Sequence, residues 1–449
     1  MKYFNLLTLC FLLTKSIYAF SNCPLNVYGK EAMNAGIYMY DIDTDSVICD
    51  YQSGKAFTPA SITKALTSAT VLTQLPNDFK FETNIYITGK IKNNTLFGDI
   101  VIDANGDATI ESKHFPANLG LCDSIVSKLK YLGISQIEGK CKINPTNFNV
   151  DCGVNPNWEI EDVAWSYGAG LYAFNYKNNT TNIIIKNGDI KTVPYTKDIS
   201  YTLLENDNRS IDLMRPFYSN DLYIVGNINN NYSNSISIPF PEDVFIDELT
   251  KKLSDNDIFI KNITIDGINQ DDKKLIHTHY SPSIHEILKS LMIRSDNLFA
   301  ESMLRAISKG NSLKHAISEE IKIWKERGLN TNFISIKDGS GLSRTNRITP
   351  LFMGEMLKWM ANSKYANIFI SYFPKAGIDG TLKSFLANSK LEGKLALKTG
   401  SMNGVQCYAG YKLNDDGKPT HIIVIMVNNF FCKRSELKKE IENLLLNTL

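Results

Sequence analysis

Apolar residues follow two different spacings along the chain, and the order of these spacings divides it into regions. Residues 35–41 and 46–49 form apolar runs separated by a polar turn, so we expect a strand hairpin that opens a sheet. From Ser61 the apolar positions recur every three or four residues as far as Leu75, which predicts a helix. Pro59 is tolerated just before a helix start.

Between residues 83 and 276 the pattern is different. Short strand-like runs are broken by asparagine, glycine and aspartate, and helical spacing recurs only over residues 123–132 and 241–253. We expect a β-rich region here, long enough for one or two small domains.

After this region helical periodicity returns. Helices are expected over residues 284–292, 298–307, 311–327 and 350–361, strands over 405–413 and 421–427, and a closing amphipathic helix over 435–449. The last helix is expected to dock on the sheet, with a membrane-surface role as the alternative. If the two ends of the chain form one domain, residues 20–82 and 277–449 make an α/β (α+β) domain in which helices flank an antiparallel sheet. Residues 83–276 are then an insertion.

The first 19 residues have the pattern of a secretory signal peptide. Lys2 precedes an apolar stretch over residues 4–13, and Ala19 is a small residue at the expected cleavage point. The apolar stretch is too short to span a bilayer stably. We therefore expect residues 1–19 to be removed and the mature chain to be exported to the periplasm.

Charge and cysteine content narrow the classes of partner and cofactor. The 449 residues carry 48 basic and 47 acidic side chains, a net charge of +1, so nothing favours a nucleic acid. No CxxC or CxxH spacing indicates a metal, and no cofactor is expected. Beyond Cys10 in the leader, the cysteines are Cys23, Cys49, Cys122, Cys141, Cys152, Cys407 and Cys432. Export permits disulfides, and Cys122, Cys141 and Cys152 are close enough for one local bridge, with the pairing left open.

Ser61 and Lys64 are the first candidate catalytic residues. A serine hydroxyl is a weak nucleophile until a base takes its proton, and residues three apart share one face of a helix. A neutral Lys64 could be that base, provided that burial or a nearby positive charge lowers its pKa. The alternative is an ordinary surface serine and lysine.

Ser295, Asp296 and Asn297 lie between two expected helices. The serine could relay a proton to a leaving amine, and the asparagine could hold a substrate amide. The alternative is that these residues only cap the following helix, with Glu301 completing the cap.

Lys398, Thr399 and Gly400 lie on an expected strand. The lysine ammonium and the threonine hydroxyl suit a substrate carboxylate, and the glycine would let a substrate strand approach closely. Lys398 is also a positive charge that could keep Lys64 neutral. The alternative is a polar sheet edge.

In this order, the three motifs are the SxxK, SDN and KTG set of penicillin-interacting serine enzymes. Together with the DGSGLSR run at residues 338–344, the AGxDGTL run at residues 376–382 and the stretch at residues 157–169, they make the chain resemble a known family. It resembles the class C low-molecular-mass penicillin-binding proteins, D-alanyl-D-alanine carboxypeptidase/endopeptidases of the peptidase S13 type. The resemblance covers most of the mature chain.

The resemblance implies a serine transpeptidase/β-lactamase-like domain with a β-rich domain inserted after the SxxK helix and a third nested inside that. The implied catalytic residues are Ser61 as the acylated group, Lys64 as its base, and Ser295 and Asn297. The implied substrate-binding residues are Lys398, Thr399 and Gly400 for the terminal carboxylate, Ser401 for the oxyanion through its N–H together with that of Ser61, and Asp162, Tyr167 and Arg344 for a diaminopimelate side chain.

Three functions are compatible with these features. A DD-peptidase would cleave D-Ala-D-Ala or D-Ala–diaminopimelate bonds of peptidoglycan stem peptides through an acyl-serine, and β-lactams would acylate Ser61. Its preference for either bond and its oligomeric state stay open, as does peripheral membrane contact. A β-lactamase of the same superfamily is disfavoured by the long insertion and the DGSGLSR run. A catalytically silent cell-wall-binding protein is disfavoured by the intact Ser61, Lys64, Ser295 and Lys398.

Two positions depart from the family pattern. Lys383 follows the AGxDGTL run where an arginine is usual, and Ala108 stands where a GDP-like turn is common. The first concerns packing near the cleft and not the chemistry.

Overall fold

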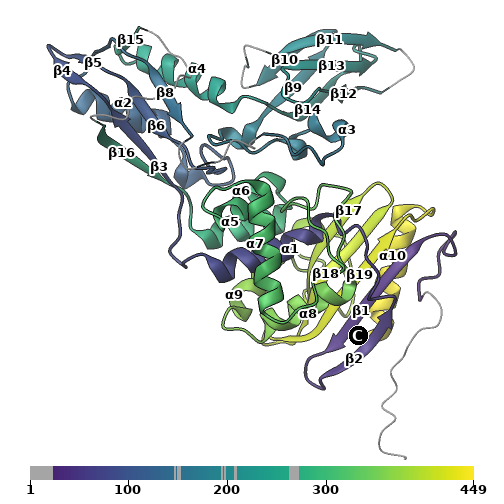
Figure 1. Cartoon of the computed structure of the whole chain (residues 1–449). Coiled ribbons are helices and arrows are strands. Elements are labelled where there is room, and N and C mark those ends of the chain that lie inside the picture. The colour runs from purple at the N-terminus through teal and green to yellow at the C-terminus, as the bar shows by residue number, and fades with distance from the viewer. Residues whose placement is uncertain are drawn as a thin grey trace, which may run out of the picture.

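The computed structural model describes residues 24–145, 148, 153–193, 196, 199–206, 210–261 and 273–449. The expected signal peptide, Cys23 and Cys152 lie outside these residues. Figure 1 shows a lower body that contains the first described strands and the last helix, with two lobes above it.

A five-stranded antiparallel sheet forms the centre of the lower body, in the order β17-β18-β19-β1-β2. Its strands are β1 Asn34–Asp41, β2 Ser46–Tyr51, β17 Leu395–Met402, β18 Val405–Leu413 and β19 Pro419–Asn428. Successive residues of a strand point to opposite faces. Ile422 and Val424 therefore join one apolar core, and Ile423 and Ile425 join a second core on the other face.

Helices cover both faces of this sheet. On one side lie α1 Thr63–Gln74, α5 Ile284–Arg294, α6 Asn297–Ala306, α7 Leu313–Glu326, α8 Pro350–Ala361 and α9 Ala366–Ile370. On the other side lies α10 Arg434–Thr448, whose Leu437, Ile441 and Leu445 are fully buried against the sheet. The expected fold class and the docking of the last helix are confirmed.

The helix α1 is buried on nearly every side, from Thr63 to Leu72. Its small and polar residues allow this, because the Thr70 hydroxyl donates to a carbonyl within the helix and the Thr67 hydroxyl donates to Gly339 O. The apolar spacing predicted one buried face. Alanine, serine and threonine on the other faces let neighbouring segments approach as well.

The segment between α1 and α5 forms the two lobes above the lower body (Figure 1). The first lobe packs two four-stranded sheets, β16-β3-β6-β8 and β15-β7-β5-β4, with two helices around one core. Its elements are β3 Glu82–Ile87, β4 Lys90–Lys92, β5 Thr95–Phe97, β6 Ile100–Asp103, α2 Leu121–Tyr131, β7 Gln136–Ile137, β8 Cys141–Asn144, α4 Pro241–Ser254, β15 Phe259–Ile260 and β16 Lys274–Tyr280.

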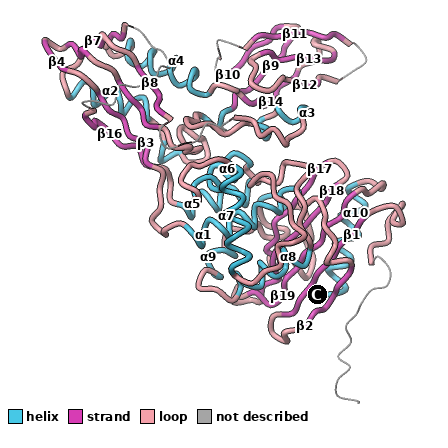
Figure 2. Tube along the Cα trace, in the orientation of Figure 1, coloured by secondary structure: helices cyan, strands magenta, loops and turns pink. Residues whose placement is uncertain are grey.

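The second lobe comes from the sequence between β8 and α4, so it is nested within the first. It contains two three-stranded sheets, β10-β9-β14 and β11-β13-β12, and Figure 2 shows how strongly strands dominate it. Its elements are α3 Ile160–Val163, β9 Thr180–Lys186, β10 Asp189–Val193, β11 Ser200–Glu205, β12 Asp212–Met214, β13 Asp221–Gly226 and β14 Tyr232–Ser237.

The chain enters and leaves the lobes through paired strands. Antiparallel pairing of β3 with β16 joins Glu82 to Tyr280, so the two crossings into the lower body are adjacent. An insertion that ended at residue 276 would cut β16 in the middle, because this strand continues to Tyr280.

The local disulfide expected near the first lobe is not formed. Every pairing among Cys122, Cys141 and Cys152 requires Cys122 or Cys141, and both of these are free and buried. Both thiols belong to the apolar core of the first lobe, and burial raises the pKa of each to about 12. Within the described ranges, no helix has the length and apolarity needed to cross a membrane.

Candidate active site

Ser61 lies in a tight 3₁₀ turn, Ala60–Ile62, that leads directly into α1. Ala60 has a φ of +48°, in the left-handed region that alanine rarely adopts. Two glycines close on this turn. A Cβ on Gly341 would lie 2.0 Å from the Ala60 carbonyl oxygen, and a Cβ on Gly400 would lie 2.5 Å from the Pro59 carbonyl oxygen. Neighbouring backbone therefore packs closely on the turn that presents Ser61.

This contact changes the interpretation of Gly400. The sequence argument gave it the task of admitting a substrate strand. In the structure, the glycine admits the protein's own Ser61 turn, because a side chain here would collide with that turn.

Lys64 is fully buried beneath this turn and reaches three oxygen atoms. Its Nζ lies 3.0 Å from Ser61 Oγ, and it donates to Asn297 Oδ1 and to the Ser340 carbonyl, each at 2.6 Å. These partners come from the turn, from α6 and from the DGSGLSR loop. Three segments that are distant in the sequence therefore meet at one amine.

Burial is the main reason for a low pKa of Lys64. It lowers the pKa to about 8, although three nearby carboxylates act in the opposite direction. Lys398 is also fully buried, and its pKa lies well below the usual value, first because of burial and then because of the charge on Lys64. The charge effect thus appears on Lys398, whereas the pKa of Lys64 is lowered by burial and not by Lys398 as expected.

The three oxygens around Lys64 can serve either form of its amine, since an ammonium could donate to all three. A neutral Lys64 has two N–H groups and one lone pair. Asn297 Oδ1 and the Ser340 carbonyl can only accept, so they take the two N–H groups. The lone pair then faces Ser61 Oγ, the one neighbour that has a proton to give. Chemically, this arrangement can remove the Ser61 proton.

Asp296 alone caps α6, which leaves its two neighbours in the motif available to the site. Its side chain accepts from Phe299 N at 3.0 Å. Ser295 ends α5 with a φ of +59°, and Asn297 Nδ2 donates to the Tyr167 carbonyl at 2.8 Å. The capping interpretation of this motif is confirmed for Asp296, and it does not exclude a role for Ser295 and Asn297.

Lys398 and Thr399 lie on β17, the edge strand of the central sheet. Lys398 Nζ donates to Ser295 Oγ at 2.9 Å and to the Thr399 carbonyl at 2.8 Å. The Thr399 hydroxyl donates to the Thr381 hydroxyl at 2.8 Å. The edge of the sheet, Ser295 and the AGxDGTL run thus meet here, and Thr381 is a neighbour that sequence reasoning did not single out.

The buried carboxylate of Asp338 holds the DGSGLSR loop in shape. Its Oδ1 accepts from Gly341 N at 2.8 Å and from Asn346 Nδ2 at 2.7 Å. Its Oδ2 accepts from Ser343 N at 2.6 Å and from Trp158 Nε1 at 2.8 Å. These bonds fix the loop whose carbonyl accepts from Lys64. The sequence marked the loop by resemblance but gave no reason for it.

Glu301 supports the same loop from α6. Its Oε1 accepts from Ser340 N at 2.8 Å. The expectation that Glu301 completes the cap of α6 is therefore wrong, because its side chain points to the loop and not to the helix start. Burial, and then the charge of Asp338, raise the pKa of Glu301 to about 7.

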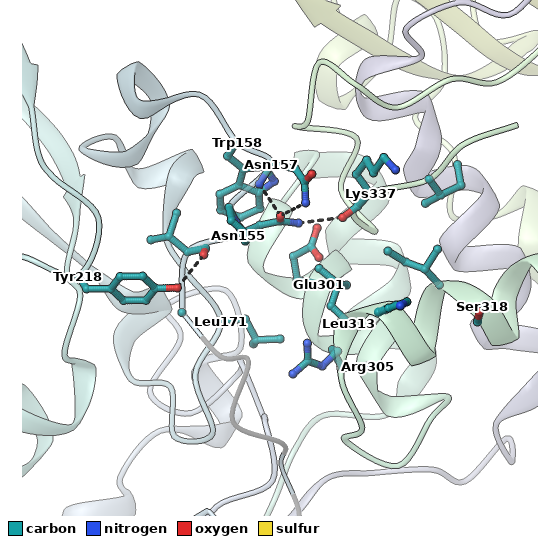
Figure 3. A pocket seen from close by; sticks show the side chains of 16 residues that line it. Asn155, Asn157, Trp158, Leu171, Tyr218, Glu301, Arg305, Leu313, Ser318 and Lys337 are labelled. Carbon is teal, nitrogen blue, oxygen red and sulfur yellow. Dashed lines mark hydrogen bonds between the residues drawn. The ribbon is translucent and has the colours of Figure 1, made fainter.

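The insertion reaches the DGSGLSR loop through two side chains. Trp158, which is 5% exposed, donates to Asp338. Asn155 Nδ2 donates to the Lys337 carbonyl at 2.9 Å (Figure 3). A cavity of about 540 Å³ lies beside this contact, between the insertion and α6, and Glu301 lines it (Figure 3). The support of the loop thus comes from both the lower body and the insertion.

A second cavity, of about 510 Å³, brings most of the candidate residues together, and we call it the site cavity. Its lining includes Ser61, Asp162, Tyr167, Ser295, Asn297, Arg344 and Ser401. Lys64 lies beneath Ser61, and Lys398 contacts Ser295 from the side of β17. The residues proposed from the insertion and those proposed from the two ends of the chain therefore converge.

Asp162, from α3 of the insertion, and Arg344, from the DGSGLSR loop, bring a carboxyl group and a guanidinium group to the site cavity. The Tyr167 hydroxyl donates to Asp162 Oδ1 at 3.0 Å, and burial raises the pKa of Asp162. Arg344 Nη1 donates to the Asn403 carbonyl at 3.3 Å, and its Nη2 lies 3.7 Å from a Glu161 carboxylate oxygen. A zwitterionic group could contact both charges.

The chain matches one protein family over nearly its full length. The profile of the D-Ala-D-Ala carboxypeptidase 3 (S13) family covers residues 28–447. Among curated proteins, the D-alanyl-D-alanine carboxypeptidase DacB of Haemophilus influenzae is 26% identical over 412 residues, which are 86% of this chain and 84% of that protein. The D-alanyl-D-alanine carboxypeptidase of an Actinomadura species is 22% identical over 433 residues, covering 88% of this chain and 78% of that protein.

Solved structures share the fold. The crystal structure of penicillin binding protein 4 from Haemophilus influenzae superposes with a TM-score of 0.80 at 24% identity, covering 94% of this chain and 97% of the other. A penicillin G-acylated predatory endopeptidase from Bdellovibrio bacteriovorus superposes with a TM-score of 0.53 at 17% identity, covering 92% of each chain.

Replacing Trp158 with phenylalanine removes one donor from the buried Asp338 and keeps most of the aromatic packing. We expect the free energy of unfolding to fall by about 1–3 kcal/mol, the cost of leaving a buried charged acceptor short of one hydrogen bond. Urea denaturation measures this. Trp359→Phe is the matched control, since no indole hydrogen bond of Trp359 is found in the described part of the chain, and it should lower stability less. Equal losses in both variants would contradict the role given to the Trp158 hydrogen bond.

Proposed function

The chain belongs to the D-Ala-D-Ala carboxypeptidase 3 (S13) family, and from this premise we propose that it hydrolyses D-Ala-D-Ala ends and D-Ala–diaminopimelate cross-links of peptidoglycan through an acyl-enzyme on Ser61. As a member of this family it is a serine-type D-Ala-D-Ala carboxypeptidase. The observation that carries the assignment of Ser61 is the buried Lys64 amine, placed 3.0 Å from Ser61 Oγ with its other two partners both acceptors.

Acylation begins when Ser61 Oγ attacks the carbonyl carbon of the penultimate D-Ala and its proton passes to Lys64 Nζ. The oxyanion that forms accepts from the backbone N–H groups of Ser61 and Ser401. Lys64 then returns the proton through Ser295 to the departing amine as the carbon–nitrogen bond breaks. Ser295 is proposed for this relay because it lines the site cavity together with Ser61. Water, deprotonated by the same amine, releases the acyl group in a second cycle.

Two pairs of groups orient the substrate in this proposal. Lys398 and Thr399 bind the carboxylate of the leaving residue, because an ammonium and a hydroxyl lie together on the edge strand β17. Asp162 and Arg344 bind the ammonium and the carboxylate of a diaminopimelate side chain, since both line the site cavity with Ser61.

β-Lactams resemble the acylating peptide and should acylate Ser61. The leader-like residues 1–19 support placement in the periplasm, where peptidoglycan lies. Mass spectrometry after exposure to benzylpenicillin tests the enzymatic assignment: a persistent adduct supports a DD-peptidase, whereas rapid turnover of the drug would favour a β-lactamase. If neither an adduct nor turnover is observed, the result favours a catalytically silent wall-binding protein.

The pKa of Lys64 sets the pH dependence of acylation. The neutral amine is the active form, and its pKa is lowered to about 8. The second-order rate constant for acylation by benzylpenicillin should therefore rise about tenfold per pH unit below about pH 8 and level off above it. Stopped-flow measurements between about pH 6 and about pH 10 give this profile. A rate constant that falls as pH rises through this range would contradict Lys64 as the base.

Ser61→Ala should abolish covalent labelling by penicillin, because the acylated oxygen is gone, and leave the fold intact. Intact-protein mass spectrometry and circular dichroism measure the two effects. Ser68→Ala is the matched control: Ser68 is a buried serine on α1, the helix that follows the Ser61 turn, and its hydroxyl has no hydrogen-bond partner within the described residues. That variant should keep full labelling, and labelling of Ser61→Ala would refute the assignment.

Asp162→Ala should reduce cleavage of a stem pentapeptide more than cleavage of a simple D-alanyl ester, since only the peptide carries a diaminopimelate ammonium. We expect a loss of roughly tenfold in kcat/KM on the peptide, as for removal of one charged hydrogen-bond partner. Glu159→Ala, an exposed acid at the start of the same helix, should change neither rate. Equal losses on both substrates would argue against a side-chain pocket at Asp162.

A further inference from the structure

A smaller cavity of about 270 Å³ continues from the site cavity toward the lobes. Tyr167, Ser295 and Asn297 line both cavities, so the two cavities are adjacent. We call the smaller one the cationic groove, because Lys113 and Arg294 line it. Lys113 follows β6 in the insertion and Arg294 ends α5 in the lower body, so two separate segments bring their charges to one place.

Neither of these two cations is neutralised by an ion pair. Within the described residues, neither Lys113 nor Arg294 forms a salt bridge or a side-chain hydrogen bond, whereas Arg344 in the site cavity lies near Glu161. The acid next to Arg294 is Asp296, and its carboxylate is engaged by Phe299 N in the cap of α6. Asp296 also lines the groove and interacts electrostatically with Arg294, so the groove carries two cations against one carboxylate.

Two neighbouring groups support a site for an anion here. His114 also lines the groove, and burial together with Arg294 and Lys113 lowers its pKa to about 4, which is the effect of a positive field on a second cation. Asn178 accepts from the Ser112 hydroxyl with its Oδ1, while its Nδ2 is buried and has no acceptor within the described residues. The groove therefore offers N–H donors beside the Asp296 carboxylate and several hydroxyl groups.

The position of Ser295 decides which part of a substrate would lie there. On one side Ser295 contacts Lys398, the group proposed to hold the carboxylate of the leaving residue. On the other side it lines the cationic groove, and Arg294 precedes it directly in sequence. The groove therefore begins where the rest of a leaving strand would continue.

We propose that the cationic groove binds a second carboxylate on the leaving strand of a cross-linked substrate. This inference rests on the proposed function and deepens it. A leaving D-Ala has one carboxylate, which Lys398 and Thr399 already bind. A leaving diaminopimelate continues into a second stem peptide, which carries a further carboxylate. Lys113 and Arg294 thus favour cleavage of cross-links over removal of a terminal D-Ala.

The test compares two substrates on the full-length mature enzyme. Purified stem pentapeptide and a D-Ala–diaminopimelate cross-linked dimer are cleaved by the wild type and by the double variant Lys113→Ala/Arg294→Ala. We expect the ratio of kcat/KM for the dimer to that for the pentapeptide to fall about tenfold, the effect of losing charge-assisted contacts to one carboxylate. For Arg294→Lys, which keeps the charge, the ratio should lie between the values of the double variant and the wild type.

The control is Lys418→Ala, an exposed lysine in the hairpin between β18 and β19, which should leave the ratio unchanged. An unchanged ratio in the double variant would overturn the inference. An equal loss on both substrates would also overturn it, since the carboxylate would then belong to the acyl-donor strand. Failure of the proposed function would be seen separately, because the wild type would then cleave neither substrate and would not be labelled by penicillin.

Discussion

The burial of one amine is the constraint on which the site depends. An ammonium enclosed in protein is costly unless it is paired and fully hydrogen-bonded, and Lys64 is fully buried. Its three oxygen partners can serve a neutral amine as well as an ammonium: Asn297 Oδ1 and the Ser340 carbonyl accept from the two N–H groups of a neutral amine, and its lone pair can face the Ser61 hydroxyl. The chemistry therefore requires that Asn297 Oδ1 and the Ser340 carbonyl stay in place.

The insertion helps to place both of these acceptors. The Tyr167 carbonyl holds the Asn297 amide, and the Trp158 indole holds Asp338 at the base of the Ser340 loop. Tyr167 also donates to Asp162, so one residue contacts the catalytic asparagine and the proposed side-chain pocket. The proposed recognition of the stem peptide and the position of Lys64 thus depend on connected hydrogen bonds, and the insertion supports the candidate site as the helices do.

Local patterns predicted the elements and the motifs, and distant contacts account for what they missed. The helical spacing after Ser61 and the order of the three motifs indicated the candidate site, because each motif consists of residues that are close together in the sequence. The contact of Gly400 with the Ser61 turn and that of Glu301 with the Ser340 loop were not predicted, since each depends on a segment far away in the sequence. The low pKa of Lys64 was foreseen, but its main cause is burial, which no motif reports.

The pairing of β1 with β19 affects when the chain can complete its fold during synthesis. Residues 34–41 form their ladder with residues 421–428, so the sheet joins the beginning of the protein to its end. Contacts of such long range form late, because the loop-closure entropy must be overcome first. Lys398 and the strand that carries it are also made last. An emerging chain therefore carries Ser61 without a finished central sheet, and the proposed activity can begin only after residues 421–428 have been made.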